Sequence, residues 1–223
     1  MSALSWKRAN TPEKKEERRR AVLQAAVQVL ERDGPTHAGM SAIAREVGLS
    51  KGNLYRYFES RETIYLHVLL EDYEAWVDRV VVSLGPLAGS DEADAVVQTL
   101  VHELVKRPRL LTLSPLVSSM LNHNVPSDVL IWFKSAMFEQ SHRATRQLQT
   151  ALPSLSMQSI DRFMASFHYL VNGMAPMAEP PGEIRDALKS TYPGETPIDF
   201  ENELHNMLVT VICGLRARSG SLQ

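Results

Sequence analysis

The chain has 223 residues, of which 44% are apolar and 22% are charged, a composition typical of a folded globular protein. No stretch approaches the roughly 18 consecutive apolar residues of a membrane-spanning helix. The charged start of the chain is followed by no apolar segment, so a secretory signal is not expected. A single cysteine, Cys213, excludes an intrachain disulfide. We therefore expect a cytoplasmic protein without a membrane partner.

The charge is distributed unevenly along the chain. Residues 1–61 contain 12 Lys and Arg against 7 Asp and Glu, whereas residues 62–223 contain 12 against 19. The first part therefore carries a net charge of +5 and the second a net charge of −7. A basic N-terminal part suits a polyanion such as nucleic acid. The run KKEERRR is equally consistent with the solvated start of a helix, so composition leaves both interpretations open.

The spacing of the apolar residues predicts an all-α chain of about nine helices. They are expected at 12–33, 41–47, 51–58, 60–84, 91–107, 108–122, 127–150, 156–175 and 198–218. The Gly34-Pro35 pair should end the first helix, and Ser90 should cap the fifth. The proline-rich segment before the last helix is expected to be a surface loop with a helical turn near 183–190.

A three-residue turn joins the second and third predicted helices. Gly48 can take the left-handed conformation that ends the first of them. Leu49 can fold back between the two helices, and Ser50 can accept a hydrogen bond from a backbone N–H as the N-cap of the next. A turn of this length is typical of a helix-turn-helix.

The helix after the turn has two different faces. At about 100° per residue, Leu54 and Phe58 fall on one side and form a buried stripe. Gly52, Asn53 and Arg56 fall on the opposite side. The sequence therefore predicts a helix that is anchored on one face and polar on the other.

The polar face suits the major groove of DNA. Arg56 can bond to guanine O6 and N7, and Asn53 can read adenine or hold a phosphate. On the flanks, Tyr55, Tyr57 and Lys51 are expected to contact phosphates. The alternative, that the tyrosines only complete a small core, leaves the polar face unexplained.

Residues 22–64, VLQAAVQVLERDGPTHAGMSAIAREVGLSKGNLYRYFESRETI, resemble the DNA-binding domain of the TetR family of bacterial transcriptional regulators. The resemblance implies a three-helix helix-turn-helix DNA-binding domain at 1–60 and a helical effector-binding and dimerisation domain at 61–223. It also implies a common set of DNA contacts. They are Ser41, Ser50, Lys51, Gly52, Asn53, Tyr55, Arg56, Tyr57 and Arg61.

The second domain is rich in methionine and aromatic residues, which suit a cavity and a plain core equally well. The family resemblance favours a pocket for a largely apolar small-molecule effector. Its expected lining is Met120, His123, Trp132, Phe133, Met137, Phe163, Phe167, His168 and Asn172.

The resemblance further implies a homodimer joined through the last two long helices. The last helix offers a broad apolar stripe for a subunit core and a dimer seam. The stripe consists of Phe200, Leu204, Leu208, Val211, Ile212 and Leu215.

Catalytic and metal-binding patterns are lacking in the sequence. HELVK at 102–106 resembles a zinc-protease motif, but Lys106 stands where the second histidine would be. We therefore expect no enzyme, cofactor or metal. The family resemblance implies a repressor that binds a palindromic operator and is released by its effector. The alternative is a DNA-binding activator or architectural protein without an effector.

Overall fold

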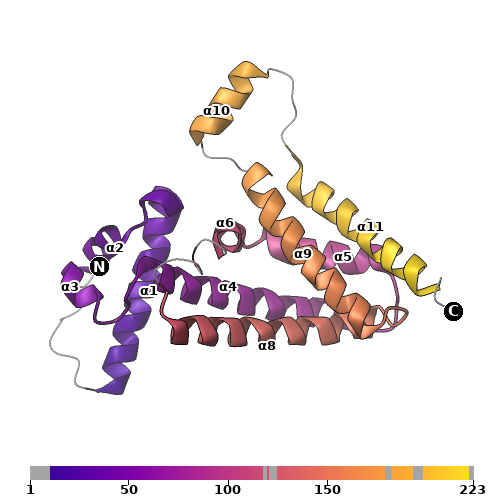
Figure 1. Cartoon of the computed structure of the whole chain (residues 1–223), viewed down its shortest axis with the longest axis horizontal. Helices are drawn as coiled ribbons and strands as arrows, with labels where there is room; N and C mark the ends of the chain where they lie inside the picture. The colour runs from indigo at the N-terminus through magenta and orange to yellow at the C-terminus, as the bar shows by residue number, and fades with distance from the viewer. Residues whose placement is uncertain (1–10, 118–119, 121–124, 179–181, 193–197, 221–223) are drawn as a thin grey trace. The chain divides into compact units, whose positions relative to one another are not determined.

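The computed structural model describes residues 11–117, 120, 125–178, 182–192 and 198–220 (Figure 1). Every regular element in these ranges is a helix, which confirms the all-α prediction. The chain divides into two compact units. The first comprises Met1–Val68 with Ser119–Leu130, and the second comprises Leu69–Ser118 with Ile131–Gln223. The division lies within helix α4 (Arg61–Ser83), beyond the boundary expected at residue 60.

The first unit is built from α1 (Pro12–His37), α2 (Met40–Val47) and α3 (Lys51–Leu54), together with the start of α4. α1 packs against α2, and α2 packs against α3. The core contains apolar side chains from each of these helices. They are Val22, Ala26, Val29, Leu30, Ile43, Ala44, Leu54, Ile64 and Leu66.

The regular part of α1 ends at Gly34-Pro35, as the sequence predicts. Gly34 leaves helical geometry with φ 74° and ψ 168°, but the chain resumes a helical turn through His37. A proline fits the first position of a new turn, because that position needs no N–H donor. The pair therefore ends the first helix, and a short second helical turn follows through His37.

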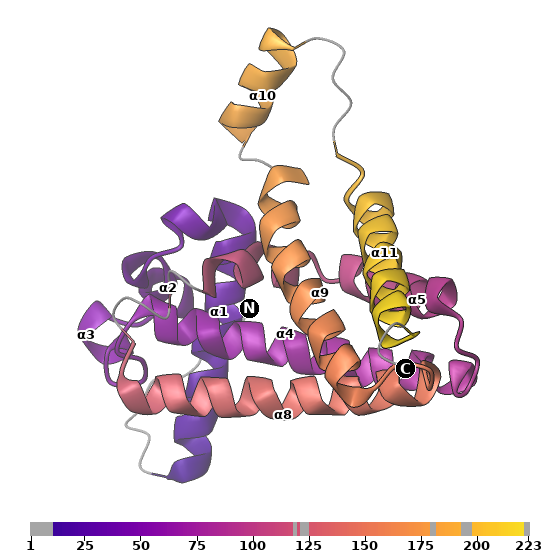
Figure 2. The same ribbon diagram turned by 45° about the vertical axis from the view of Figure 1, so that its right-hand side comes forward.

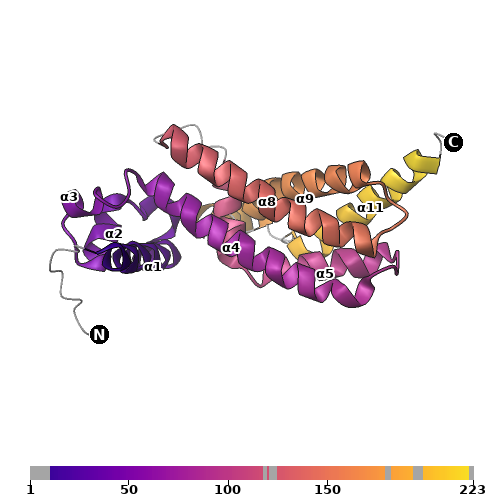
Figure 3. The same cartoon turned by 90° about the horizontal axis from the view of Figure 1, so that it is seen from below.

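The second unit contains the helices α5 (Ala93–Val105), α6 (Pro108–Leu113), α8 (Ser127–Ala151) from Ile131 onward, α9 (Met157–Ala178), α10 (Gly182–Thr191) and α11 (Phe200–Gly220). Two short 3-10 helices, η1 (Gly85–Leu87) and η2 (Ser114–Leu116), complete it. α11 packs against α5 and α9, as Figures 1 and 2 show. α8 lies against the second part of α4 (Figure 3), and Arg143 Nη2 pairs with Asp78 Oδ1 across them at 2.6 Å.

The core of the second unit is centred on Trp76, which is fully buried on α4. Its ring stacks on Phe167 with centroids 5.1 Å apart, and its indole N–H donates to the Leu100 carbonyl at 3.4 Å. Stacked rings of this kind bury a large apolar area while the N–H keeps a partner. Trp76 therefore joins α4, α5 and α9 in one core.

Three predicted helix boundaries in the second unit were wrong. The helix expected at 108–122 ends at Leu113, because Pro115 cannot continue the α-helical hydrogen bonds and the chain tightens into η2. The turn expected near 183–190 is the ten-residue helix α10. The N-cap of α5 is Glu92, while Ser90 Oγ accepts from the Glu92 N–H at 3.3 Å. Among the described residues, no helix combines the length and hydropathy needed to cross a membrane.

Candidate nucleic-acid interface and small-molecule site

The turn between α2 and α3 has the geometry that the sequence predicts. Gly48 takes φ 72° and ψ 30°, a left-handed conformation that costs glycine little, and its N–H donates to the end of α2. The Leu49 N–H donates to the Ala44 carbonyl at 2.8 Å. Ser50 Oγ accepts from the Asn53 N–H at 3.3 Å and caps α3. The turn is therefore fixed by local hydrogen bonds on both sides.

The recognition segment, residues 50–58, is anchored on one side. Leu54 and Phe58 are buried, whereas Gly52, Asn53 and Arg56 are exposed, which confirms the predicted faces. The helix itself is shorter than predicted. α3 ends at Leu54, and the next residues close turns in which the Tyr57 and Phe58 N–H groups donate to the Leu54 carbonyl at 2.9 and 3.2 Å.

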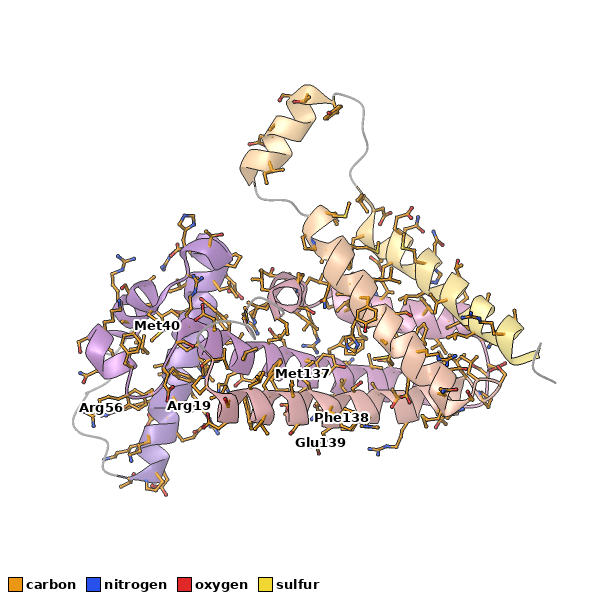
Figure 4. All side chains as sticks on the ribbon, viewed as in Figure 1. Arg19, Met40, Arg56, Met137, Phe138 and Glu139 are labelled. Carbon is orange, nitrogen blue, oxygen red and sulfur yellow. The ribbon has the colours of Figure 1, made fainter. Side chains whose placement is uncertain are left out.

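The end of this segment is held by two arginines of α1. Arg18 Nη1 donates to Tyr57 Oη at 3.3 Å, and Arg19 Nη1 donates to the Tyr57 carbonyl at 3.4 Å. The Arg19 guanidinium also lies over the Phe58 ring, 4.3 Å from its centroid. Figure 4 marks Arg19 on α1 and Arg56 on the segment. These contacts fix the orientation of the segment against α1.

Arg19 has a further partner on α4. Its Nη2 donates to His67 Nε2, and because a guanidinium can only donate, the His67 ring is neutral at this nitrogen. Burial and the nearby Arg19 charge lower the pKa of His67 to about 4. The His67 ring also meets Phe58 edge to face, with centroids 5.7 Å apart. Arg19 and His67 therefore enclose Phe58 from two helices.

The nine expected DNA contacts all lie in the first unit. Between Ser50 and Tyr57, six are exposed and Tyr57 is half-buried. Ser41 is exposed near the start of α2. Arg61 begins α4, and its Nε pairs with Glu62 Oε1 at 2.9 Å. The positive end of Arg61 is thus partly neutralised by its neighbour.

The residues expected to line a small-molecule pocket do not gather around one cavity. Phe133, Phe163 and Phe167 are buried, and Trp132 is exposed. Half-buried Asn172 accepts from Ser114 Oγ at 2.6 Å. The others differ in position. Met137 is half-buried on α8, Met120 is buried in the first unit, and His123 lies outside the described residues.

A groove of about 440 Å³ lies between α8 and α9, a volume suited to a small molecule. Of the expected pocket residues, only His168 lines it. The lining side chains come from both helices. They are Phe138, Ser141, His142, Thr145, Asp161, Met164, Ala165, His168 and Tyr169.

A hydrogen bond lies behind this groove. Tyr73 Oη on α4 lies 3.1 Å from His168 Nε2. His168 also bonds to the Met164 backbone, which assigns its Nδ1 as the donor and Nε2 as the acceptor from Tyr73. Burial lowers the pKa of His168 and raises the pKa of Tyr73 to about 12, so both groups are neutral at pH 7.

The stripe expected at the dimer seam is mostly buried within the chain itself. Leu204, Leu208, Ile212 and Leu215 face the core, and only Phe200 and Val211 are half-buried. A separate hollow of about 710 Å³ lies between α9 and α11. Its lining includes small and polar residues. They are Arg162, Ala165, Ser166, Tyr169, Val211, Gly214, Leu215 and Arg218.

Two groups of functional candidates were not found from the sequence. Arg18 and Arg19 stand within the charged run, where nothing distinguishes a side chain that reaches Tyr57, some forty residues later, from a solvated one. In the groove, Phe138 and His142 are four residues apart on α8 and face each other with centroids 4.2 Å apart. Residues four positions apart on a helix lie on the same face, so the sequence could have indicated this contact. Within the described residues, no three His, Cys, Asp or Glu side chains are grouped to hold a metal ion.

Two family models match the chain. Residues 22–68 match the model described as bacterial regulatory proteins, tetR family. Residues 70–219 match the model described as tetracyclin repressor-like, C-terminal domain. The second match alone covers more than half of the chain.

Individual proteins agree with these matches. An uncharacterized HTH-type transcriptional regulator of Mycobacterium tuberculosis (strain CDC 1551 / Oshkosh) is 37% identical over 70 residues, which are 30% of this chain and 33% of that protein. The alignment thus spans about one third of the length of the curated relatives it matches.

Solved structures show the same fold. The TetR family regulator PfmR from Thermus thermophilus aligns with a TM-score of 0.55 at 13% identity, over 87% of this chain and 97% of that one. The fatty acid degradation regulator FadR from Bacillus halodurans aligns with a TM-score of 0.53 at 15% identity, over 85% and 97%. With both family models matched in chain order, the chain belongs to the TetR family of bacterial transcriptional regulators.

Proposed function

We propose that the chain is a repressor that binds a palindromic operator as a homodimer and is released when a small molecule binds its second unit. The observation that carries the DNA-binding part is the recognition segment. Its exposed face of Gly52, Asn53 and Arg56 stands on the buried anchors Leu54 and Phe58. An exposed polar face on a rigid support is what direct readout of base edges requires.

The individual roles follow from the side-chain chemistry. Arg56 is placed to bond two acceptors of a guanine, and Asn53 to read adenine or hold a phosphate. Phosphate contacts come from Lys51, Tyr55 and Tyr57, with Ser41, Ser50 and Arg61 at the edges of the surface. Gly52 leaves the first turn of α3 open, because a Cβ there would meet nothing within 4 Å.

A dimer supplies the second recognition segment. We place its seam on the outward faces of α9 and α11, where Met177 and Met207 are 66% and 42% exposed, instead of on the buried leucines of α11. Two segments related by a two-fold axis read half-sites about one helical turn, or 34–36 Å, apart. The expected operator is therefore a palindrome.

Release requires a ligand that binds one conformation better than another. Such coupling between sites typically amounts to about 1–3 kcal/mol. We propose that α4 carries it, because α4 contributes Arg61–Val68 to the first unit and Leu69–Ser83 to the second. The ligand site proposed here is the α8/α9 groove, in place of the buried phenylalanines that the sequence suggested.

The second candidate function is a DNA-binding activator or architectural protein without an effector. Neither candidate involves catalysis, and both act on chromosomal DNA in the cytoplasm. The two candidates differ in what they predict for the α8/α9 groove, because a protein without an effector does not need a ligand site. The groove of about 440 Å³ favours the ligand-released repressor.

The DNA-binding proposal is tested by selecting genomic fragments that the purified protein retains and measuring affinity for the enriched site. Arg56→Ala should weaken that site by about 1–3 kcal/mol and relax preference at one base pair. Lys51→Ala should weaken all sequences alike and lower the salt dependence. Arg146→Ala, which removes an exposed arginine of α8, is the matched control. If Arg56→Ala and Arg146→Ala bind the site equally well, the groove assignment is wrong.

A further inference from the structure

The α8/α9 groove carries two exposed aromatic rings. Phe138 on α8 is 67% exposed and Tyr169 on α9 is 76% exposed. Single exposed apolar side chains are common, but these two large rings border the same groove and so form one apolar surface. The His142 ring stands edge-on to Phe138, which limits how far Phe138 can turn away. The groove therefore presents two aromatic surfaces, one from each helix.

The groove also has a clear charge. Asp161 is exposed on α9 and is the one carboxylate among its described lining residues, which include neither lysine nor arginine. His168 at the base is neutral, because its Nε2 accepts from Tyr73 and partial burial lowers its pKa. Ser141 and Thr145 add hydroxyl groups, and Met164 and Ala165 add apolar surface. The site is thus aromatic and anionic.

We infer that this groove binds a planar organic cation, with its rings against Phe138 and Tyr169 and its charge held by Asp161. Aromatic faces attract cations through their quadrupole, and the attraction grows where water is displaced. A carboxylate beside such faces favours a positive ligand over a neutral one of the same shape and repels an anion. The claim that the bound cation is the effector rests on the proposed function. The claim that the groove binds a cation does not.

The base of the groove offers a route to α4. Tyr73 belongs to α4 and is hydrogen-bonded to His168, which lines the groove. A ligand that bonds His168 Nε2 competes with Tyr73 for the same atom. Tyr73 is therefore a positioning residue through which occupancy of the groove acts on α4.

The test uses three two-ring probes of similar shape: 1-methylquinolinium, neutral quinoline and anionic 1-naphthoate. Calorimetric titration of the full chain without DNA should rank the cation first and the anion last. Asp161→Asn keeps the shape of the side chain and should weaken the cation about three- to tenfold, with quinoline unchanged. Phe138→Leu should weaken both the cation and quinoline.

Glu139→Gln is the matched control, because Glu139 is an exposed carboxylate next to Phe138 on α8 that does not line the groove (Figure 4). It should leave all three affinities unchanged. Equal affinity for the cation in the parent and in Asp161→Asn would overturn the inference. An equal loss in Glu139→Gln, or no binding of any probe, would overturn it as well.

Operator release is measured separately, so that the two proposals fail in different ways. Release of operator DNA by the cation from the parent, but not from Asp161→Asn, supports both proposals and excludes action of the cation on DNA alone. If the cation binds in an Asp161-dependent way but does not release operator DNA, the cation site is supported and the proposed release mechanism is refuted. If the protein binds the operator but binds none of the probes, the cation site is refuted and the DNA-binding proposal is unaffected.

Discussion

The recognition segment and the α8/α9 groove expose polar side chains in different ways. In the first unit, the exposed side chains of 50–57 follow one another along the chain, and their support comes from buried Leu54 and Phe58 in the same segment. In the second unit, the groove needs Ser141 and Asp161 from two helices and a hydrogen bond to Tyr73 on a third. A surface built along one segment is determined by local spacing, whereas a groove depends on how helices pack.

A half-buried histidine in each unit shows the same contrast. His67 in the first unit accepts from the charged Arg19, and His168 in the second accepts from the neutral hydroxyl of Tyr73. Burial lowers the pKa of both. Only at His67 does a neighbouring cation lower it further. Protonation should therefore disturb the first unit through direct repulsion between two positive charges.

The largest expected effect is on the anchor of the recognition segment. Leu54→Ala removes the buried residue of α3 and leaves a cavity, so it should lower the free energy of unfolding by about 2–5 kcal/mol and abolish operator binding. Urea unfolding followed by circular dichroism measures the first effect. Leu49→Ala, at a half-buried position, should cost less. Equal costs for the two would show that α3 is not anchored through Leu54.

A pH titration tests the Arg19–His67 contact. The unfolded histidine gains a proton near pH 6.5, whereas the folded His67, with its pKa at about 4, does not. The stabilisation is therefore present above pH 6.5 and is lost as the pH falls from 6.5 towards 4, by about 2 kcal/mol once solvent screening of the partly exposed ring is allowed for. Unfolding free energies across this range measure it. His67→Gln keeps an acceptor for Arg19 but cannot titrate, so the contact is refuted if this variant has the same pH dependence as the parent.

The cap of α3 separates stability from DNA binding. Ser50→Ala removes the acceptor of the Asn53 N–H and should lower the free energy of unfolding by roughly 1 kcal/mol. Ser50→Asp keeps a good cap and should retain stability, but its negative charge beside the phosphates should weaken operator binding. Thermal unfolding and operator titration of both variants measure this difference. A stable Ser50→Asp with parental operator affinity would place Ser50 away from the DNA.

The smallest expected effect concerns the hydrogen bond behind the groove. Tyr73→Phe removes the hydroxyl that bonds His168 Nε2, at a cost of about 0.5–1.5 kcal/mol in unfolding free energy. Binding of 1-methylquinolinium should persist, while its effect on operator affinity should shrink. Calorimetry and operator titration separate these two results. If 1-methylquinolinium released the operator equally well from Tyr73→Phe and the parent, Tyr73 would not transmit ligand binding to α4.

Sequence reasoning succeeded where the determining interactions are local. The left-handed Gly48, the Ser50 cap and the buried pair Leu54 and Phe58 depend on residues within four positions of one another. It failed where a single proline changes the helix type, as at Pro115. Periodicity alone cannot show whether a proline will kink a helix or end it, because the answer depends on the packing of the following turn.

The sequence by itself determined the all-helical class, the helix-turn-helix and the faces of its recognition segment, because caps and helical spacing act over a few residues. Only the tertiary structure decided that Arg18 and Arg19 hold Tyr57, that the phenylalanines of α9 are core, and that the groove is lined by Phe138 and Asp161 instead. An apolar helix face has the same sequence pattern whether it packs against a neighbouring helix or lines a groove. The difference arises from the packing of helices that are distant in the chain.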